Sequence, residues 1–180
     1  MKLPMFKYSP NVYELGVFDS IDGVCSICNE QRNLKYTGSF YSIHKPDYIC
    51  PWCIADGKAA EKYNGEFNDY LGIEGVSPDP NDPPPSIAQE LLIEVTEKTP
   101  GYHSFQPEVW LTHCGEPCAL IGYADSETIK PYLTELRADI EYLGYPSEYI
   151  INHLTKDGPL AGYLFQCLTC GQHRLHADGD

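Results

Sequence analysis

The chain has 180 residues, and its 12 basic and 26 acidic side chains give it a formal net charge of −14. The surplus of carboxylates excludes a generic nucleic-acid-binding surface, which needs Lys and Arg to neutralise phosphates, and an anionic membrane would repel the chain for the same reason. No stretch reaches the about 20 apolar residues of a membrane-spanning helix, and the N-terminus lacks the apolar segment of a signal peptide, so we expect a cytoplasmic protein.

The first 73 residues contain two cysteine pairs at short spacing, Cys25/Cys28 and Cys50/Cys53. Residues 36–49, between the pairs, are rich in Tyr, Phe and Ile and predict a strand, a turn and a strand. A short helix is predicted to begin at the second pair, in CPWCIADGKAAEKYNG. Since cytoplasmic thiols are kept reduced, such pairs indicate a metal rather than disulfides. We therefore predict a ribbon-like or treble-clef-like module over residues 1–73, with a structural zinc ion bound by the four cysteines.

A proline-rich acidic segment, residues 74–86, follows this module. It has little to bury, so we expect a loop. Residues 87–98 then predict an amphipathic helix with Ser86 as its cap. Residues 107–124 predict two buried strands joined by a cysteine-bearing turn.

The last third of the chain predicts two helices and a final strand. Residues 125–143 form the best amphipathic pattern, with Asp125 or Ser126 as the cap. A shorter helix is predicted over residues 146–158, before a strand and a second cysteine turn. This mixed order indicates an α+β fold with short β-hairpins and three or four helices. We expect residues 87–180 to form a second zinc module that packs with the first as one compact unit.

The second module contains another four cysteines, Cys114 and Cys118 followed by Cys167 and Cys170. Four thiolates complete one tetrahedron, so we predict that they bind the second of two structural zinc ions. Three alternatives stay open: exchange of one ligand for His113 or His173, a disulfide, and thiols without metal.

The sequence offers little for catalysis. A metal closed by four thiolates leaves no position for water, so hydrolysis is not expected at either site. The histidines are dispersed, and His103 in a predicted loop is the one that could line a site. CPWC resembles a redox CxxC, but the pair CSIC supplies it with a metal partner instead. We predict a protein that is not an enzyme and has no catalytic residue; the alternative is an enzyme that uses a cleft between the modules.

Four segments of specific sequence extend over nearly the entire chain. They are LPMFKYSP near the N-terminus, CPWCIADGKAAEKYNGEF at 50–67, TPGYHSFQPEVWLTHCGEPC at 99–118 and GYLFQCLTCGQHRL at 162–175. Together they resemble the CbrC family of bacterial colicin-tolerance proteins. The resemblance implies the cysteine framework and a bacterial, cytoplasmic, non-enzymatic protein, and it implies no catalytic residue.

The link to toxins and the acidic charge suggest one functional hypothesis. A nuclease toxin is basic where it contacts phosphate, and an acidic inhibitor would be steered towards it. We hypothesise an immunity protein that binds and neutralises a toxin domain in the cytoplasm, with zinc as a source of rigidity. The alternative is a zinc-ribbon adaptor or stress-response regulator that binds an endogenous protein. Although a solvated surface is the simpler interpretation for each, the candidate partner contacts are the carboxylates Glu74, Asp79, Asp82, Glu127, Glu135, Asp139 and Glu141.

Overall fold

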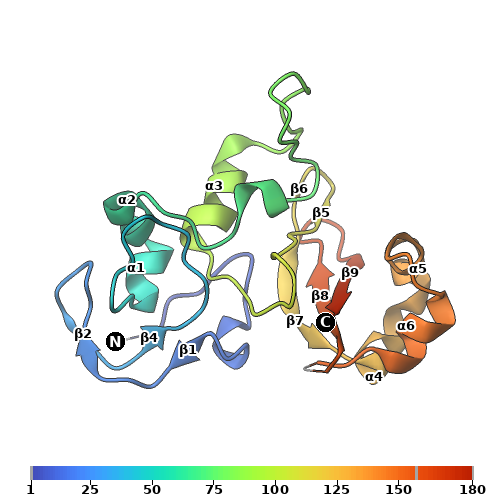
Figure 1. Ribbon diagram of the computed structural model, residues 1–180, viewed down its shortest axis with the longest axis horizontal. Coiled ribbons are helices and arrows are strands. Elements are labelled where there is room, and N and C mark those ends of the chain that lie inside the picture. The colour runs from blue at the N-terminus through green and yellow to red at the C-terminus, as the bar shows by residue number, and fades with distance from the viewer. Residues whose placement is uncertain (1, 157, 180) are drawn as a thin grey trace.

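The computed structural model describes residues 2–156 and 158–179 and shows an α+β protein built from small antiparallel sheets and short helices. Figure 1 shows the N-terminal part in blue and cyan on one side, a sheet near the middle, and a group of orange helices on the other side. The predicted fold class is confirmed.

Two short ladders form the β-structure of the N-terminal part. Strand β1 (Phe18–Asp19) pairs with β4 (Lys35–Tyr36), and β2 (Gly23–Val24) pairs with β3 (Gln31–Arg32), both antiparallel. Short 3-10 helices lie outside these ladders, at Val12–Glu14 and Tyr70–Gly72.

The strand pair predicted over residues 36–49 is wrong. Beyond β4 this segment is irregular, and its β-type pairing is one isolated bridge between Tyr41 and Glu66 among the described residues. The buried positions Phe40, Tyr48 and Ile49 do not alternate with exposed ones as in a half-buried strand. The aromatic residues therefore enter the core one at a time from a folded loop.

The helix predicted at the second cysteine pair is split in two. Helix α1 (Pro51–Ala55) begins directly after Cys50, and its first residue is a proline, whose missing N–H would be unpaired there in any case. Helix α2 (Lys58–Tyr63) follows after Gly57, whose φ of 75° is the left-handed conformation that favours glycine. Glycine has no Cβ, so the chain can turn at Gly57 between α1 and α2 without a steric clash.

Helix α3 (Gln89–Lys98) packs against both α1 and α2. The predicted cap at Ser86 is wrong, because Ala88 occupies the N-cap position. The segment before it, residues 74–86, has no helix or strand, and it projects from the top of the molecule in Figure 1.

A hairpin and a three-stranded sheet follow α3. Strands β5 (Thr112–His113) and β6 (Glu116–Pro117) form the hairpin. Strands β7 (Ala119–Ala124), β8 (Leu160–Gln166) and β9 (His173–Gly179) form an antiparallel sheet in the order β7-β8-β9. The hairpin turn and the β8–β9 connection each contain cysteines.

Three helices lie beside this sheet, at the right of Figure 1. Helix α4 (Ser126–Ile129) and helix α5 (Leu133–Tyr142) are separated by a 3-10 turn (Lys130–Tyr132), and helix α6 (Ser147–His153) follows. The single helix predicted over residues 125–143 is therefore interrupted. Pro131 explains the interruption, because it has no backbone N–H to donate and its ring clashes with the preceding turn of an α-helix.

The main hydrophobic core contains residues from both predicted modules. Tyr8 and Ile54 from the N-terminal part share it with Leu92 of α3 and Phe165 of β8, and each is fully buried. A second core, which includes Leu136 of α5, lies between the sheet and helices α4–α6. The loop at residues 74–86 thus connects segments that share one core.

Hydrogen bonds also join the N-terminal part to the sheet and to the loop after α3. The Leu120 amide of β7 donates to the carbonyl of Tyr8 at 2.8 Å. The Gly101 amide donates to the Tyr36 hydroxyl at 3.1 Å. Within the described residues, none of the helices is long and apolar enough to cross a membrane.

Candidate metal centres

Two groups of metal-binding side chains occur among the residues that the structure describes. The first consists of Cys25, Cys28, Cys50 and Cys53, whose sulfur atoms all lie within 4.8 Å of one another. The Cys25 and Cys53 sulfurs are 3.8 Å apart. A tetrahedral zinc with Zn–S bonds of about 2.3 Å would separate its sulfurs by about 3.8 Å. The first group therefore fits a four-coordinate metal ion.

The electrostatics of the first group also favour a cation. A hydrogen bond from the Cys50 thiol lowers the pKa of Cys25 to about 4, while the same contact raises the pKa of Cys50. Burial raises the pKa of Cys53 to about 12. Without a metal, four close sulfurs cannot all become thiolates, because each negative charge opposes the next. A bound cation would remove this repulsion.

The two CxxC turns outside the helices have the same backbone geometry. The Asn29 amide donates to the Cys25 carbonyl, and the Gly171 amide donates to the Cys167 carbonyl, both at 2.9 Å. The residue after each pair, Asn29 or Gly171, has a positive φ, of 59° and 79° respectively. Asparagine and glycine are the residues that adopt this left-handed conformation most readily. Sequence and backbone therefore build the same thiolate-presenting turn twice.

The second group consists of His113, Cys114, Cys167 and Cys170. The His113 Nδ1 atom lies 3.3 Å from the sulfur of Cys114 and 3.3 Å from the sulfur of Cys170. A tetrahedral site with Zn–N of about 2.0 Å and Zn–S of about 2.3 Å places N and S about 3.5 Å apart. Three sulfurs and one imidazole nitrogen form a common zinc donor set, so this group also fits a metal ion.

Cys118, an expected ligand, is not a member of this group. Its side chain is fully buried in the main core, and the indole N–H of Trp110 donates to its carbonyl at 2.9 Å. Burial raises the pKa of Cys118 to about 12. The structure brings His113 into the position expected for Cys118, which is one of the exchanges the sequence left open.

The backbone around the hairpin accounts for this difference. Cys114 and Gly115 both have positive φ, of 52° and 76°, at the tip of the β5–β6 hairpin. His113 ends β5 beside that turn, whereas Cys118 directly precedes the buried strand β7. His173, the other candidate for exchange, instead stacks on Tyr132 with ring centroids 3.8 Å apart.

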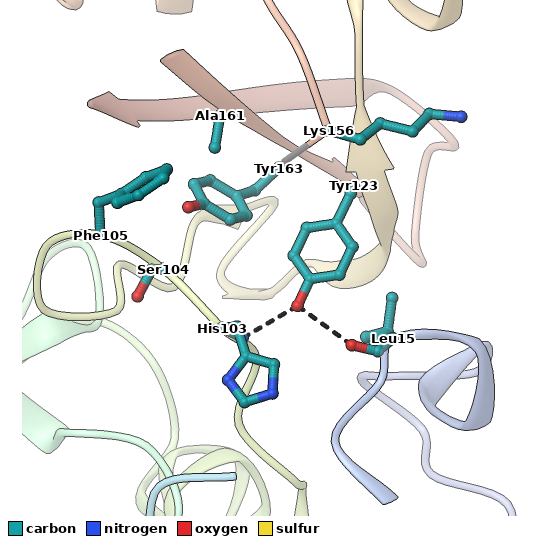
Figure 2. Close-up of a pocket in the computed structure, with 8 residues that line it drawn as sticks. All are labelled: Leu15, His103, Ser104, Phe105, Tyr123, Lys156, Ala161 and Tyr163. Atoms are coloured by element: carbon teal, nitrogen blue, oxygen red, sulfur yellow. Dashed lines mark hydrogen bonds between the residues drawn. The ribbon is translucent and has the colours of Figure 1, made fainter. Parts of the chain in front are cut away.

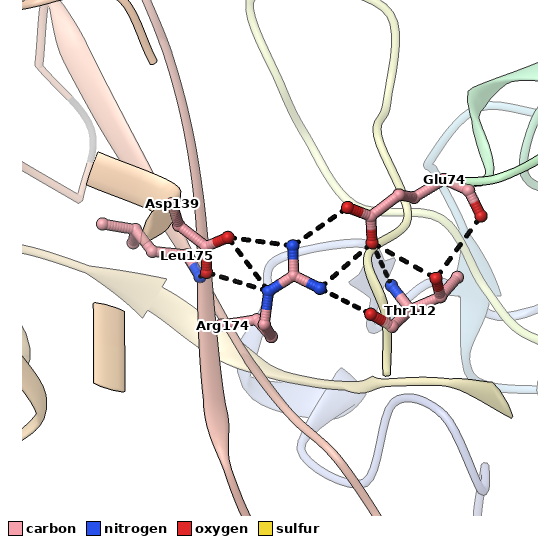
Figure 3. A network of polar contacts seen from close by, with 5 residues as sticks. All are labelled: Glu74, Thr112, Asp139, Arg174 and Leu175. Atoms are coloured by element: carbon pink, nitrogen blue, oxygen red, sulfur yellow. Dashed lines mark hydrogen bonds and ion pairs between the residues drawn. The ribbon is translucent and has the colours of Figure 1, made fainter. Parts of the chain in front are cut away.

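Three of the candidate partner contacts also bind other parts of the molecule: Asp139, which is buried, and Glu74 and Glu135, which stay exposed. Figure 3 shows Arg174 of β9 between the carboxylates of Glu74 and Asp139. The guanidinium Nε donates to both Asp139 oxygens at 3.0 Å, and Nη2 is 3.0 Å from Glu74 Oε1. Glu135 accepts from the backbone N–H of His173. These carboxylates hold the sheet, α5 and the 74–86 loop together.

The other four candidate carboxylates lie on exposed residues. Asp79 and Asp82 bond within their own loop, to Asn81 and Ser77. Glu127 pairs with Lys130, and its side chain keeps 77% of its area exposed. Glu141 at the end of α5 is exposed as well. Of the seven predicted contacts, Asp139 is the one that is buried, and the other six lie on exposed residues.

Comparison with known proteins identifies the family. A model described as "Uncharacterised protein family (UPF0167)" matches residues 3–179. The chain belongs to this family. UPF0167 protein PA1536 of Pseudomonas aeruginosa is 35% identical over 182 residues, which cover 98% of this chain and 97% of that protein. UPF0167 protein Mb2317 of Mycobacterium bovis and UPF0167 protein MT2352 of Mycobacterium tuberculosis are each 34% identical over 185 residues, covering 98% of this chain and 94% of each relative.

No solved structure matches this UPF0167 chain. The narrower resemblance to the CbrC family stays a prediction, since the comparisons give the family as UPF0167. The structure shows which donor atoms each of the two candidate centres offers. Each offers four donors from the protein, which satisfy a tetrahedral ion without a water ligand.

Proposed function

We propose that this UPF0167 protein is a binding protein, stabilised by two zinc ions, that captures a basic protein partner. Zinc is the metal that suits both donor sets, since four sulfurs or three sulfurs and one nitrogen in a tetrahedron favour it. With four protein donors, neither centre keeps the open position that zinc hydrolases use for water. The centres would therefore supply rigidity rather than catalysis.

The observation that supports partner binding most directly is a set of exposed tyrosines at the end of α5, in the α5–α6 connection and on α6, called here the α5–α6 surface. Tyr142 has 91% of its area exposed, and Tyr145 and Tyr149 are 48% and 44% exposed. The rings of Tyr145 and Tyr149 stack with centroids 6.0 Å apart, and Tyr149 stacks on His153 at 4.4 Å. Tyrosines are among the side chains that contribute most to binding at protein interfaces.

Carboxylates accompany the tyrosines of the α5–α6 surface. Glu141 lies beside Tyr142 in sequence, Glu148 lies beside Tyr149, and both are exposed. Glu148 was not among the contacts predicted from the sequence. Tyrosine rings next to carboxylates attract Lys and Arg, through cation–π contacts and ion pairs. The partner that fits is a protein with a basic surface.

A bacterial nuclease toxin domain is the basic partner that we propose, with this chain as its immunity protein. The formal charge of −14 would steer such a domain towards the chain and accelerate their encounter. The test is to co-express nuclease toxin domains with and without this chain and to count surviving cells. Survival should rise when the chain is present, and native mass spectrometry should detect a one-to-one complex with two zinc ions.

The surface is tested with matched variants. Tyr142→Ala combined with Tyr149→Ala should weaken the complex by at least about tenfold, the effect of removing interface hot spots. Ile43→Ala is the control, because Ile43 is also 91% exposed and belongs to the N-terminal part. Equal killing with and without the chain would contradict the immunity hypothesis. A stable complex with an endogenous basic protein instead would favour an adaptor.

A further inference from the structure

A cavity of about 430 Å³ lies where the N-terminal part meets the three-stranded sheet. Figure 2 shows that Leu15 enters it from the N-terminal part, His103 and Phe105 from the loop after α3, and Tyr123 and Tyr163 from the sheet. Lys156 also lines it, and Figure 2 shows its ammonium directed away from the aromatic rings. Pockets of about 300–1,000 Å³ are the usual size for small-molecule sites. This cavity is separate from both metal centres and from the α5–α6 surface.

The loop after α3 forms one wall of the cavity, and hydrogen bonds at His103 and Gln106 hold it at both ends. The Tyr123 hydroxyl accepts from the His103 amide at 3.0 Å and donates to the Leu15 carbonyl at 3.3 Å, as the dashed lines in Figure 2 show. At the other end, the Gln106 amide donates to Asp178 Oδ2 at 3.0 Å. Asp178 Oδ1 in turn accepts from the Tyr163 hydroxyl at 2.7 Å. The cavity is therefore formed before any ligand enters, which lowers the entropic cost of binding.

The lining favours a flat, apolar ligand. Phe105, Tyr123 and Tyr163 contribute three aromatic rings. The rings of Tyr123 and Tyr163 lie edge to face, with centroids 5.9 Å apart. Phe105 remains 50% exposed, so a large apolar ring faces water when the cavity is empty of ligand. An aromatic ligand would cover this ring and gain stacking or edge-to-face contacts.

The charge at the cavity favours an anion. Of the lining side chains among the described residues, Lys156 carries a positive charge and none is a carboxylate. The nearest partner of Lys156 is Asp125, whose Oδ2 lies 3.6 Å away on a half-exposed surface pair. Such a pair is weak, so Lys156 can turn to a ligand at little cost. The Asp178 carboxylate lies behind the lining and is occupied by the Tyr163 hydroxyl and the Gln106 amide. Carboxylates more than about 8 Å from the cavity are screened at physiological salt.

We propose that this cavity binds a small planar aromatic carboxylate, with its ring between Phe105, Tyr123 and Tyr163 and its carboxylate at Lys156. The proposal is independent of any protein partner. Three probes with the same ring test it: 2-naphthoate, 2-naphthalenemethanol and 2-naphthylmethylammonium. Isothermal titration calorimetry on the zinc-loaded chain measures each affinity.

The acid should bind about fivefold more tightly than the alcohol, as one exposed ion pair permits, and the ammonium should bind most weakly. Phe105→Ala should weaken the acid and the alcohol alike, by about tenfold for a lost aromatic contact. Lys156→Met keeps the apolar stem but removes the charge, so the acid and the alcohol should bind with equal affinity. Both positions are exposed, so melting temperature and zinc content should not change and serve as the folding check.

Tyr142→Ala is the matched control, since it removes an exposed aromatic ring outside the cavity. It should leave all three affinities unchanged. If Tyr142→Ala and Phe105→Ala lowered the affinity for the probes equally, the probes would be adsorbing nonspecifically and the proposal would be overturned. Tightest binding of the ammonium would overturn the charge assignment, and absence of saturable binding for every probe would overturn the site.

Discussion

Cys114 and Cys118 are separated by three residues but lie in opposite environments. Cys114 is exposed at a turn tip, with its sulfur 3.3 Å from His113 Nδ1. Cys118 is fully buried in the main core. The same side chain is thus a candidate metal donor at one position and a small apolar core residue at the other.

We predict that alanine substitutions will separate these roles. Cys114→Ala should leave one bound zinc ion per chain, because the second centre loses a donor. Cys118→Ala should keep both ions and cost about 1–2 kcal/mol of folding free energy through the space left in the core. Native mass spectrometry counts the metal and urea unfolding measures the stability. If Cys118→Ala bound a single ion, the donor set would be the four cysteines instead.

Glu74 shows how one side chain connects distant segments. Burial alone would raise its pKa, but the hydrogen bonds and charge of Arg174 and the Thr112 amide together lower the pKa below its ordinary value. A carboxyl whose folded pKa is lowered stabilises the fold above its unfolded pKa, and this contribution is lost as the pH falls through the folded pKa.

We therefore expect Glu74→Gln to be less stable than the parent chain at pH 7, and the difference to shrink as the pH falls below about 4.5, the ordinary pKa of Glu. The side chain is 41% exposed, so solvent screening limits the difference at pH 7 to about 1 kcal/mol. Urea unfolding of both proteins across this range is the measurement. Acid also displaces zinc from both proteins. The comparison therefore uses the difference between their free energies of unfolding at each pH, in which this shared effect cancels. A constant difference would refute the assignment.

At the scale of elements, local side chains decide where the C-terminal helices begin and break. Asp125 caps α4: its Oδ1 accepts from the Thr128 amide at 2.8 Å and from the Thr128 hydroxyl at 2.6 Å. This bears out the cap predicted from the sequence. The break before α5 was missed, although Pro131 could have indicated it.

Removal of this cap gives an element-scale prediction. Asp125→Ala leaves the Thr128 amide without its acceptor and should cost about 1 kcal/mol. For a chain of this length, that corresponds to a fall of about 2–4 °C in melting temperature. Asp125→Asn is the control, since its amide oxygen can still accept, and it should stay close to the parent chain. Equal melting temperatures for all three proteins would mean that the cap adds nothing.

At the scale of the whole molecule, the two candidate metal centres differ in their access to solvent. Three sulfurs of the first centre, from Cys25, Cys50 and Cys53, are buried with at most 2% of each residue exposed. In the second centre Cys114 and Cys170 are both exposed. A chelator must reach a metal to remove it, so the centres should release zinc at different rates.

We predict two phases when excess EDTA is added to the zinc-loaded protein. The second centre should empty first with small loss of structure, and the first centre should empty later, together with unfolding of the N-terminal part, because a structural metal contributes folding free energy directly. Released zinc is followed with a chromogenic dye and structure by circular dichroism. Cys114→Ala should remove the fast phase and Cys50→Ser the slow one. A single phase would contradict this order.

The sequence by itself determined the features that depend on short spacing. The CxxC pairs, the first donor set, the capped helix after Asp125 and the α+β class all follow from local patterns of turn residues, thiols and apolar periodicity. Tertiary structure decided what depends on distant contacts. It placed His113 rather than Cys118 beside Cys167. It also paired Glu74 and Asp139 with Arg174, and it formed the cavity that Leu15 and Tyr163 line. The physical reason is that these residues meet only after the core has packed, and no local pattern encodes which side of a turn or helix will then be buried.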